Sequence, residues 1–125
     1  MVSAIDNMST ALTANPTVTH WVIYSCNDDG VLGAVRAMEN AGYNPDQAIG
    51  VGIDGSRSCG IFGQGRDSGF RGTMYIRSAE NGRIAVELLL AAIEEGNDIP
   101  TTTYVDAVYL SEDNFDQYEA ELCDG

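Results

Sequence analysis

Basic residues are scarce in this sequence. Nineteen acidic residues stand against six basic ones, and the formal net charge at neutral pH is -13. Such a charge repels the phosphates of nucleic acids and anionic membranes, and it leaves few cations to hold a phosphorylated substrate. We therefore expect no nucleic acid partner and a neutral or cationic ligand. The alternative is that the acidity only keeps the protein in solution.

Cysteine and histidine are also few. The three cysteines, Cys26, Cys59 and Cys123, have the spacing of neither a CxxC redox pair nor a zinc ligand set. A bridge between Cys59 and Cys123 is compatible with the sequence, which does not decide it. The single histidine, His20, precedes an apolar run, and no serine or cysteine lies in a nucleophile motif. We therefore expect no catalytic residue, no enzyme activity and no metal site.

Long apolar runs are absent as well. No segment is long and apolar enough to cross a bilayer, and residues 1–16 lack the basic start and apolar run of a signal peptide. We expect no export signal in this stretch. With 125 residues, 44% of them hydrophobic, the chain suits a single hydrophobic core.

Helical and strand patterns alternate along the chain. Strands are predicted over residues 20–26, 48–54, 72–77 and 103–110. Helices are predicted over residues 4–14, from Asp28 or Asp29 to Gly42, and over 79–95 and 112–122. Residues 56–70 are rich in glycine and serine, so we expect a loop with one turn of helix at most. This alternation predicts an α/β fold around a parallel sheet.

The stretch IGVGIDG, residues 49–55, satisfies G-x-G-x-x-G through Gly50, Gly52 and Gly55. A dinucleotide site needs these glycines in the turn after a strand, at the start of a helix. Here Gly50 and Gly52 lie inside the apolar run, and Asp54 would place a carboxylate beside the phosphates. We therefore expect no nucleotide cofactor.

Polar residues follow the first two predicted strands at their carboxyl ends, where open α/β sheets bind ligands. Cys26, Asn27 and Asp28 end the first strand, and Asp54 ends the second. If these strands are neighbours, an amide and a carboxylate meet, and together they suit adjacent hydroxyl groups of a polyol. The alternative is that Asn27 and Asp28 cap a helix and Asp54 only forms a turn. The spacing does not decide between the two.

The predicted helix over residues 79–95 is apolar around much of its circumference. It needs cover on more than one side. Either it is buried, or the partner that covers it is missing from this chain. The apolar residues are Ile84, Val86, Leu88, Leu89, Leu90 and Ile93.

Four segments together carry a family resemblance: HWVIYSCNDDGVLGAVRAMENAGY, IGVGIDG, GFRGTMYIR and VYLSEDNFDQYEAEL. In this order they look like the carboxyl-terminal part of bacterial periplasmic sugar-binding proteins of ABC transporters, above all the arabinose-binding members. The resemblance implies a type I periplasmic binding fold, three-layer αβα with a mainly parallel sheet, of which this chain is an incomplete carboxyl-terminal lobe. It also implies a periplasmic protein that recognises a monosaccharide, catalyses no reaction and delivers the sugar to a membrane permease.

The resemblance also implies the site residues. The family's sugar-binding asparagine falls on Asn27, beside Asp28, and Cys26 replaces a methionine that packs against the sugar. Where arabinose-binding members have a second asparagine, this chain has Asp54, which is similar to the acceptor aspartate of galactose- and ribose-binding relatives. The implied ligand is therefore a pentose or hexose in its ring form rather than arabinose in particular.

The resemblance divides the chain into two parts. Residues 1–77 and 103–125 belong to the sugar-binding lobe, and 78–102 form a helix and hinge crossing that would pack on an absent amino-terminal lobe. Left exposed, the helix Ala79 to Glu95 should favour a homo-oligomer. The alternatives are the effector domain of a LacI-type regulator, an oligomeric interaction module without sugar binding, and an enzyme of the nucleotide-binding α/β class.

Overall fold

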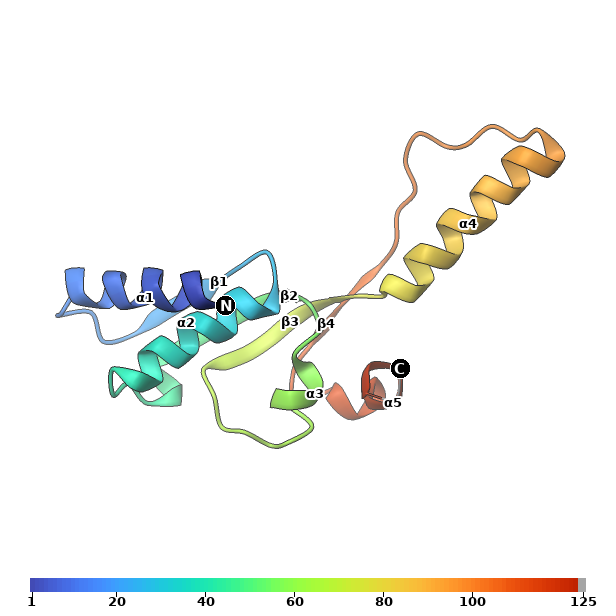
Figure 1. The fold of residues 1–125 in the computed structure, drawn as a ribbon. Helices are drawn as coiled ribbons and strands as arrows, with labels where there is room; N and C mark the ends of the chain where they lie inside the picture. The colour runs from blue at the N-terminus through green and yellow to red at the C-terminus, as the bar shows by residue number, and fades with distance from the viewer. Residues whose placement is uncertain (124–125) are drawn as a thin grey trace.

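A sheet of four strands organises residues 1–123, the part of the chain that the computed structural model describes (Figure 1). The strands lie in the order β1-β2-β3-β4. β1, β2 and β3 are parallel, whereas β4 runs antiparallel to β3. The α/β fold with a mainly parallel sheet, predicted from the sequence, is thereby confirmed. The bounds are Trp21–Tyr24 for β1, Ala48–Asp54 for β2, Phe70–Ile76 for β3 and Ala107–Leu110 for β4.

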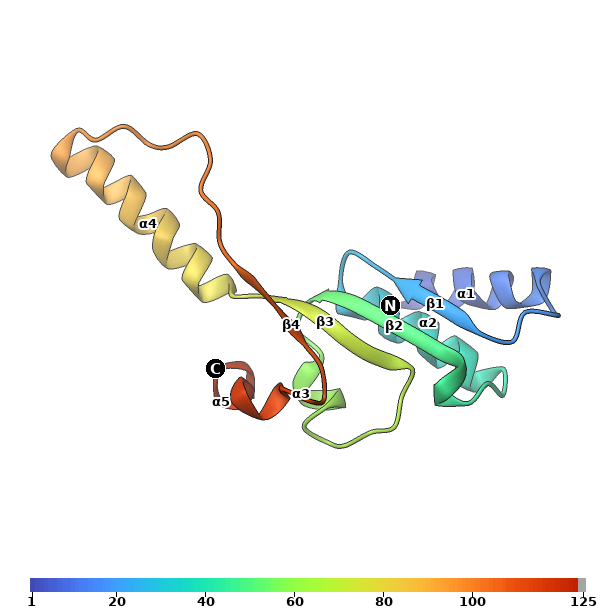
Figure 2. The same ribbon diagram turned by 180° about the vertical axis from the view of Figure 1, so that it is seen from behind.

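Helices α1 and α2 cover one face of the sheet, as the two opposite views of Figures 1 and 2 show. Two further short helices, α3 and α5, lie below β3 and β4 in the view of Figure 1. Within residues 1–123, no helix has both the length and the hydropathy of a membrane span. The bounds are Val2–Ala14 for α1, Asp28–Asn40 for α2, Ser58–Ile61 for α3, Ser78–Glu95 for α4 and Glu119–Cys123 for α5.

Two of the predicted elements differ from those observed. The predicted helix over residues 112–122 is a 3₁₀ turn at Phe115–Gln117 followed by α5, because the Asn114 side chain accepts from the Ser111 amide and donates to the Tyr109 carbonyl, which makes a turn. The predicted strand over residues 103–110 begins only at Ala107. Ala107 pairs with Ile76, the last residue of β3, so the preceding residues have no strand beside them.

The core lies between α2 and the sheet. One cluster joins α1 to α2 through Met8, Leu12 and Met38. The other packs Val31 and Val35 of α2 against residues of α3 and β3. α2 is therefore the helix that both clusters share, and its position decides where its amino-terminal end lies.

The glycines of β2 explain how α2 comes so close to the sheet. A Cβ atom at Gly50 would overlap the Val31 side chain, and one at Gly52 would overlap a carboxylate oxygen of Asp28. Gly50 and Gly52 lie within β2, as predicted, and not in a turn that opens a helix. The G-x-G pattern thus serves helix packing on the strand.

The opposite face of the sheet is largely open in the described part of the chain. Val22 and Tyr24 of β1 are 76% and 87% exposed, and Ile49 of β2 is 52% exposed. A sheet face of this kind is normally covered by a helix or by another sheet. In the described residues, this face of the sheet therefore lacks a covering layer.

Helix α4 extends away from the rest of the chain (Figures 1 and 2). None of its residues is buried, and Ile93 is 78% exposed. Of the two alternatives from the sequence, a helix buried within this chain does not hold for the described residues. The alternative from the sequence, an apolar helix without its covering partner, fits the structure.

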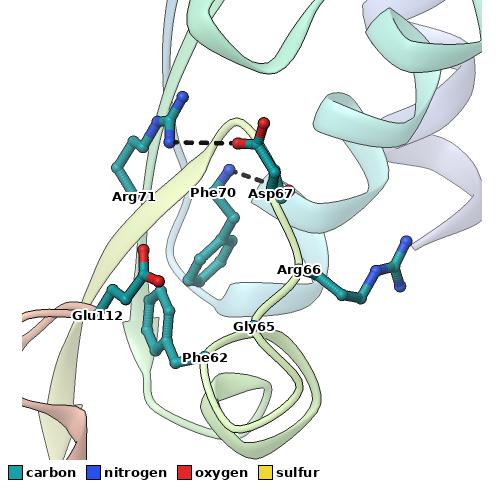
Figure 3. A pocket seen from close by; sticks show the side chains of 8 residues that line it. Phe62, Gly65, Arg66, Asp67, Phe70, Arg71 and Glu112 are labelled. Carbon is teal, nitrogen blue, oxygen red and sulfur yellow. Dashed lines mark hydrogen bonds and ion pairs between the residues drawn. The ribbon is translucent and has the colours of Figure 1, made fainter.

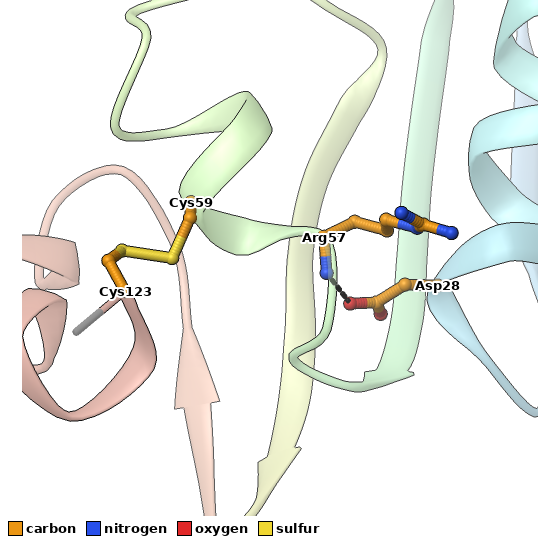
Figure 4. Close-up of a disulfide and its surroundings, with 4 residues drawn as sticks. All are labelled: Asp28, Arg57, Cys59 and Cys123. Atoms are coloured by element: carbon orange, nitrogen blue, oxygen red, sulfur yellow. Dashed lines mark hydrogen bonds between the residues drawn. A yellow bond between two sulfur atoms is a disulfide. The ribbon is translucent and has the colours of Figure 1, made fainter. Parts of the chain in front are cut away.

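A disulfide joins Cys59 of α3 to Cys123 of α5 across 64 residues of sequence, and Figure 4 shows the bridge. Two other contacts hold the same carboxyl-terminal segment. The ring of Phe115 lies 6.0 Å from that of Phe62, and the Tyr75 hydroxyl donates to Glu121 at 3.0 Å. α5 is thus fixed against α3 and β3, which the sequence left undecided.

We predict that reducing this disulfide lowers the free energy of unfolding by about 4 kcal/mol, because a closed loop of this length restricts the unfolded chain. The Cys59→Ser variant, compared with wild type in denaturant titrations followed by circular dichroism, measures the effect. Cys26→Ser is the matched control because Cys26 is free and exposed. An unfolding midpoint that ignores reductant would contradict the prediction.

Candidate functional site

The carboxyl ends of β1 and β2 meet at one place because the two strands are parallel neighbours, with Tyr24 paired to Val51. Cys26 and Asn27 follow β1, and Asp54 is the last residue of β2. The condition set by the sequence, that these two strands adjoin, is met. We call this place the carboxyl end of the sheet.

Asn27 caps helix α2. Its side-chain oxygen accepts from the Gly30 amide at 2.9 Å, so the sequence was right to offer Asn27 as a cap, whereas Asp28 and Asp29 are not the cap. An amide oxygen accepts two hydrogen bonds and the amide nitrogen donates two, so capping uses only part of this side chain. Asn27 is exposed, and the neighbouring thiol of Cys26 is free and exposed. Both side chains can therefore reach a ligand at this end of the sheet.

Asp54 lies in a tight turn. One of its carboxylate oxygens accepts from the Ser56 amide at 2.7 Å. Its φ is 108°, a conformation that residues other than glycine rarely adopt, and Gly55 follows with φ 82°. The second oxygen is not used by this turn, so a turn and a ligand contact are compatible.

Asp28 is turned inward. It is 0% exposed, and its carboxylate accepts from the Thr73 hydroxyl at 2.6 Å and from the Arg57 amide at 3.1 Å. Burial raises the pKa of Asp28 above its usual value, and the neighbouring Asp54 carboxylate raises it further, whereas the two hydrogen bonds lower it. The predicted contact between Asp28 and the ligand stays a prediction. In this structure its carboxylate accepts hydrogen bonds from two groups of the protein itself, the Thr73 hydroxyl and the Arg57 amide.

Arg57 brings a positive charge to the same place. Its Nε atom donates to Asp29 at 2.7 Å, and this bond lowers the pKa of the Asp29 carboxyl and raises that of Arg57. Nothing in the sequence indicates Arg57, because the contact with Asp28 comes from the backbone amide of Arg57. Thr73 had a weak signal, as a polar residue within an apolar strand. Neither was predicted as part of the site.

The cavity in Figure 3 lies elsewhere. It has a volume of about 230 Å³ and is lined by Phe62, Phe70, Arg71 and Glu112 among others. Phe70 begins β3 and Glu112 follows β4, so this cavity lies at the amino end of the parallel strands. It contains none of the four residues predicted to bind the ligand.

Two curated proteins are similar to this chain over most of its length. One is the ABC transporter L-arabinose-binding periplasmic protein of Azospirillum brasilense, 33% identical over 89% of the chain. The other is the L-arabinose-binding periplasmic protein of Escherichia coli, 33% identical over 90% of the chain. The chain spans only about a third, 34%, of each of these relatives. No protein-family model matches it.

Solved structures share the fold. An ABC transporter solute-binding protein from Agrobacterium vitis, with bound allitol, matches 96% of this chain with a TM-score of 0.79 at 24% identity, the match covering 41% of that protein. A LacI family transcriptional regulator from Arthrobacter, in complex with lactose, matches 87% with a TM-score of 0.68 at 23% identity, covering 39% of that protein. The predicted resemblance to periplasmic sugar-binding proteins of ABC transporters is confirmed.

The close approach of Asp28 to β2 predicts that Gly52→Ala destabilises the protein by about 1 to 3 kcal/mol, because the added methyl group overlaps the buried carboxylate. Gly60→Ala is the matched control. A Cβ atom there meets nothing within 4 Å, so its stability should stay within about 1 kcal/mol of wild type. Denaturant unfolding measures both, and equal stability of Gly52→Ala and wild type would contradict the close packing.

Proposed function

We propose that this chain is the carboxyl-terminal, sugar-recognising part of a solute-binding protein of an ABC transporter. Its ligand is a pentose or hexose in the ring form, and it catalyses no reaction. The observation that carries this proposal is that Asn27 and Asp54 both lie at the carboxyl ends of two adjacent parallel strands. The relatives named as arabinose-binding proteins support it from the sequence.

In this proposal each side chain has a role that its chemistry allows. The carboxylate of Asp54 accepts hydrogen bonds from sugar hydroxyl groups, and the amide of Asn27 both donates and accepts. Cys26 lines the apolar side of the sugar ring. The net charge of -13 suits a neutral ligand better than a phosphorylated one.

We further propose a periplasmic location and a membrane permease as the partner that receives the sugar. Both relatives are named periplasmic proteins. The bridge between Cys59 and Cys123 supports this location, since disulfides persist in oxidising compartments. No nucleic acid takes part.

The same proposal assigns residues 78–102 to a helix and hinge crossing. In the longer protein, α4 packs on a second, amino-terminal lobe, and the sugar lies between the two lobes. The exposed apolar side chains of α4 and its distance from the sheet support this assignment. Residues 1–77 and 103–125 then form the sugar-binding lobe, of which the last two residues lie outside the described part.

A LacI-type effector domain is the second candidate, favoured by the structural similarity to the lactose-bound regulator. It would use the same end of the sheet for a sugar but would regulate transcription. The coding sequence upstream of Met1 separates the two candidates. A second α/β lobe behind a signal peptide supports the transport protein, and a helix-turn-helix directly before that lobe supports the regulator.

The proposed role of Asp54 predicts that Asp54→Ala, in the protein that carries both lobes, weakens sugar binding by about 1.5 to 3 kcal/mol, roughly 10- to 150-fold. Titration calorimetry with arabinose, galactose and ribose measures the affinity. Asp67→Ala is the matched control, because Asp67 lines the cavity at the amino end of the strands. Unchanged affinity in Asp54→Ala would remove this residue from the site.

The chain alone should bind sugar weakly or not at all, and nanomolar affinity of the chain alone would contradict the need for a second lobe.

The exposed face of α4 predicts that the chain alone forms a homo-oligomer, so that light scattering gives a mass above the 13.4 kDa of one chain. Leu89→Glu and Ile93→Glu should return the mass toward that of a monomer. Glu94→Gln on the same helix is the control and should leave the assembly unchanged. A wild-type monomer at tens of micromolar would contradict this prediction.

A further inference from the structure

One buried carboxylate joins three elements behind the proposed sugar site. Asp28 begins α2, and its two oxygens accept from the Thr73 hydroxyl of β3 and from the backbone amide of Arg57, which follows β2. Figure 4 shows the Arg57 amide directed at this carboxylate. Gly52 leaves the space in which Asp28 lies against β2. The carboxylate therefore connects α2 and β3 to the turn that carries Asp54.

This turn has a backbone conformation that needs support. Asp54 has φ 108° and Gly55 has φ 82°. A residue other than glycine keeps such a conformation only where its surroundings hold it, at a cost of about 1 to 3 kcal/mol. Within the turn, the Ser56 amide holds one oxygen of Asp54. The next amide, that of Arg57, is the one that Asp28 holds.

Two other contacts hold the segment that follows Asp54: an ion pair of Arg57 and the disulfide of Cys59. The Arg57 side chain pairs with Asp29, and both groups are partly exposed to solvent, so this pair contributes little to stability. Cys59 is cross-linked to Cys123 two residues beyond Arg57. Among these contacts, the hydrogen bond to Asp28 is the one made by a buried group to the backbone of the turn itself.

We propose that Asp28 is a positioning residue for Asp54: by accepting the Arg57 amide, it holds the turn in which the Asp54 carboxylate faces the ligand. This proposal rests on the proposed function, in which Asp54 binds the sugar. Asp28 itself does not touch the sugar, since its carboxylate is 0% exposed and occupied by internal donors. The two neighbouring residues Asn27 and Asp28 thus have different tasks: Asn27 is exposed and binds the ligand, whereas Asp28 is buried and holds the turn.

The first test follows the Arg57 amide by hydrogen exchange, measured by nuclear magnetic resonance on the chain with its disulfide intact. Asp28→Ala should speed exchange of this amide at least tenfold relative to the Val51 amide of β2, which serves as the internal reference for overall stability. Asp28→Asn should restore most of the protection, because an amide oxygen also accepts a hydrogen bond. Asp29→Ala is the matched control and should leave the Arg57 amide unchanged, although it removes the ion pair of the same residue.

Thr73→Val provides a variant for the case that Asp28→Ala does not fold. It removes one donor from the carboxylate and leaves the acceptor for Arg57 in place, so exchange of the Arg57 amide should rise above the wild-type rate. Wild-type exchange of this amide in Thr73→Val and in any folded Asp28→Ala sample would overturn the proposal. Exchange of the Arg57 amide that is as fast in Asp29→Ala as in Asp28→Ala would also overturn the proposal.

The second test measures sugar affinity in the protein with both lobes. Asp28→Ala should weaken binding nearly as much as Asp54→Ala, the double variant should be little worse than either, and Asp28→Asn should recover most of the affinity. Additive losses, or a full loss in Asp28→Asn with the Arg57 amide still protected, would mean that Asp28 contacts the sugar itself and would overturn the proposal. If Asp54→Ala leaves sugar affinity unchanged, the proposed function fails, while the exchange data still decide whether Asp28 holds the turn.

Discussion

The buried carboxylate of Asp28 is the interaction on which the candidate site depends. It accepts hydrogen bonds from β3 and from the turn after β2, while belonging to the first turn of α2. Burying a charged group is unfavourable unless donors compensate for the lost water, and here a hydroxyl and a backbone amide do so. Because the three elements share this acceptor, none of them can shift without leaving a donor or the carboxylate unpaired in the interior.

At the carboxyl end of the sheet, the buried Asp28 carboxylate supports the structure, and the proposed ligand contacts belong to Asn27 and Asp54. Asn27 caps α2 with its side-chain oxygen and is exposed as a residue, whereas Asp54 accepts from the Ser56 amide with one carboxylate oxygen. Each of these side chains therefore makes a structural contact with only one of its polar atoms. Because these side chains are already held in place, ligand binding costs less conformational entropy than it would with mobile side chains.

Away from the site, the chain has surfaces that its own residues do not cover. One face of the sheet exposes Val22 and Tyr24, and α4 extends into solvent. The Cys59–Cys123 disulfide and the contacts of α5 hold the other end of the described chain together. The well-packed part is thus the layer of α1 and α2 on the sheet, and this layer carries the site. These features agree with relatives of which the chain spans about a third.

The sequence alone determined the alternation of strands and helices, the place of Asn27 and Asp54 at strand ends, and the excess of apolar residues on α4, because periodicity and turn residues are local properties. Through the order of its motifs, it also predicted the resemblance to periplasmic sugar-binding proteins. Only the tertiary structure decided that Asp28 faces inward, that Thr73 and the Arg57 amide meet it, and that Cys59 pairs with Cys123. Thr73 is 45 residues from Asp28 and Cys123 is 64 from Cys59, and contacts over such separations follow from how the helices pack on the sheet. The Arg57 contact could not be predicted for another reason. Its donor is a backbone amide, which every residue except proline has, so the residue type at this position does not indicate it.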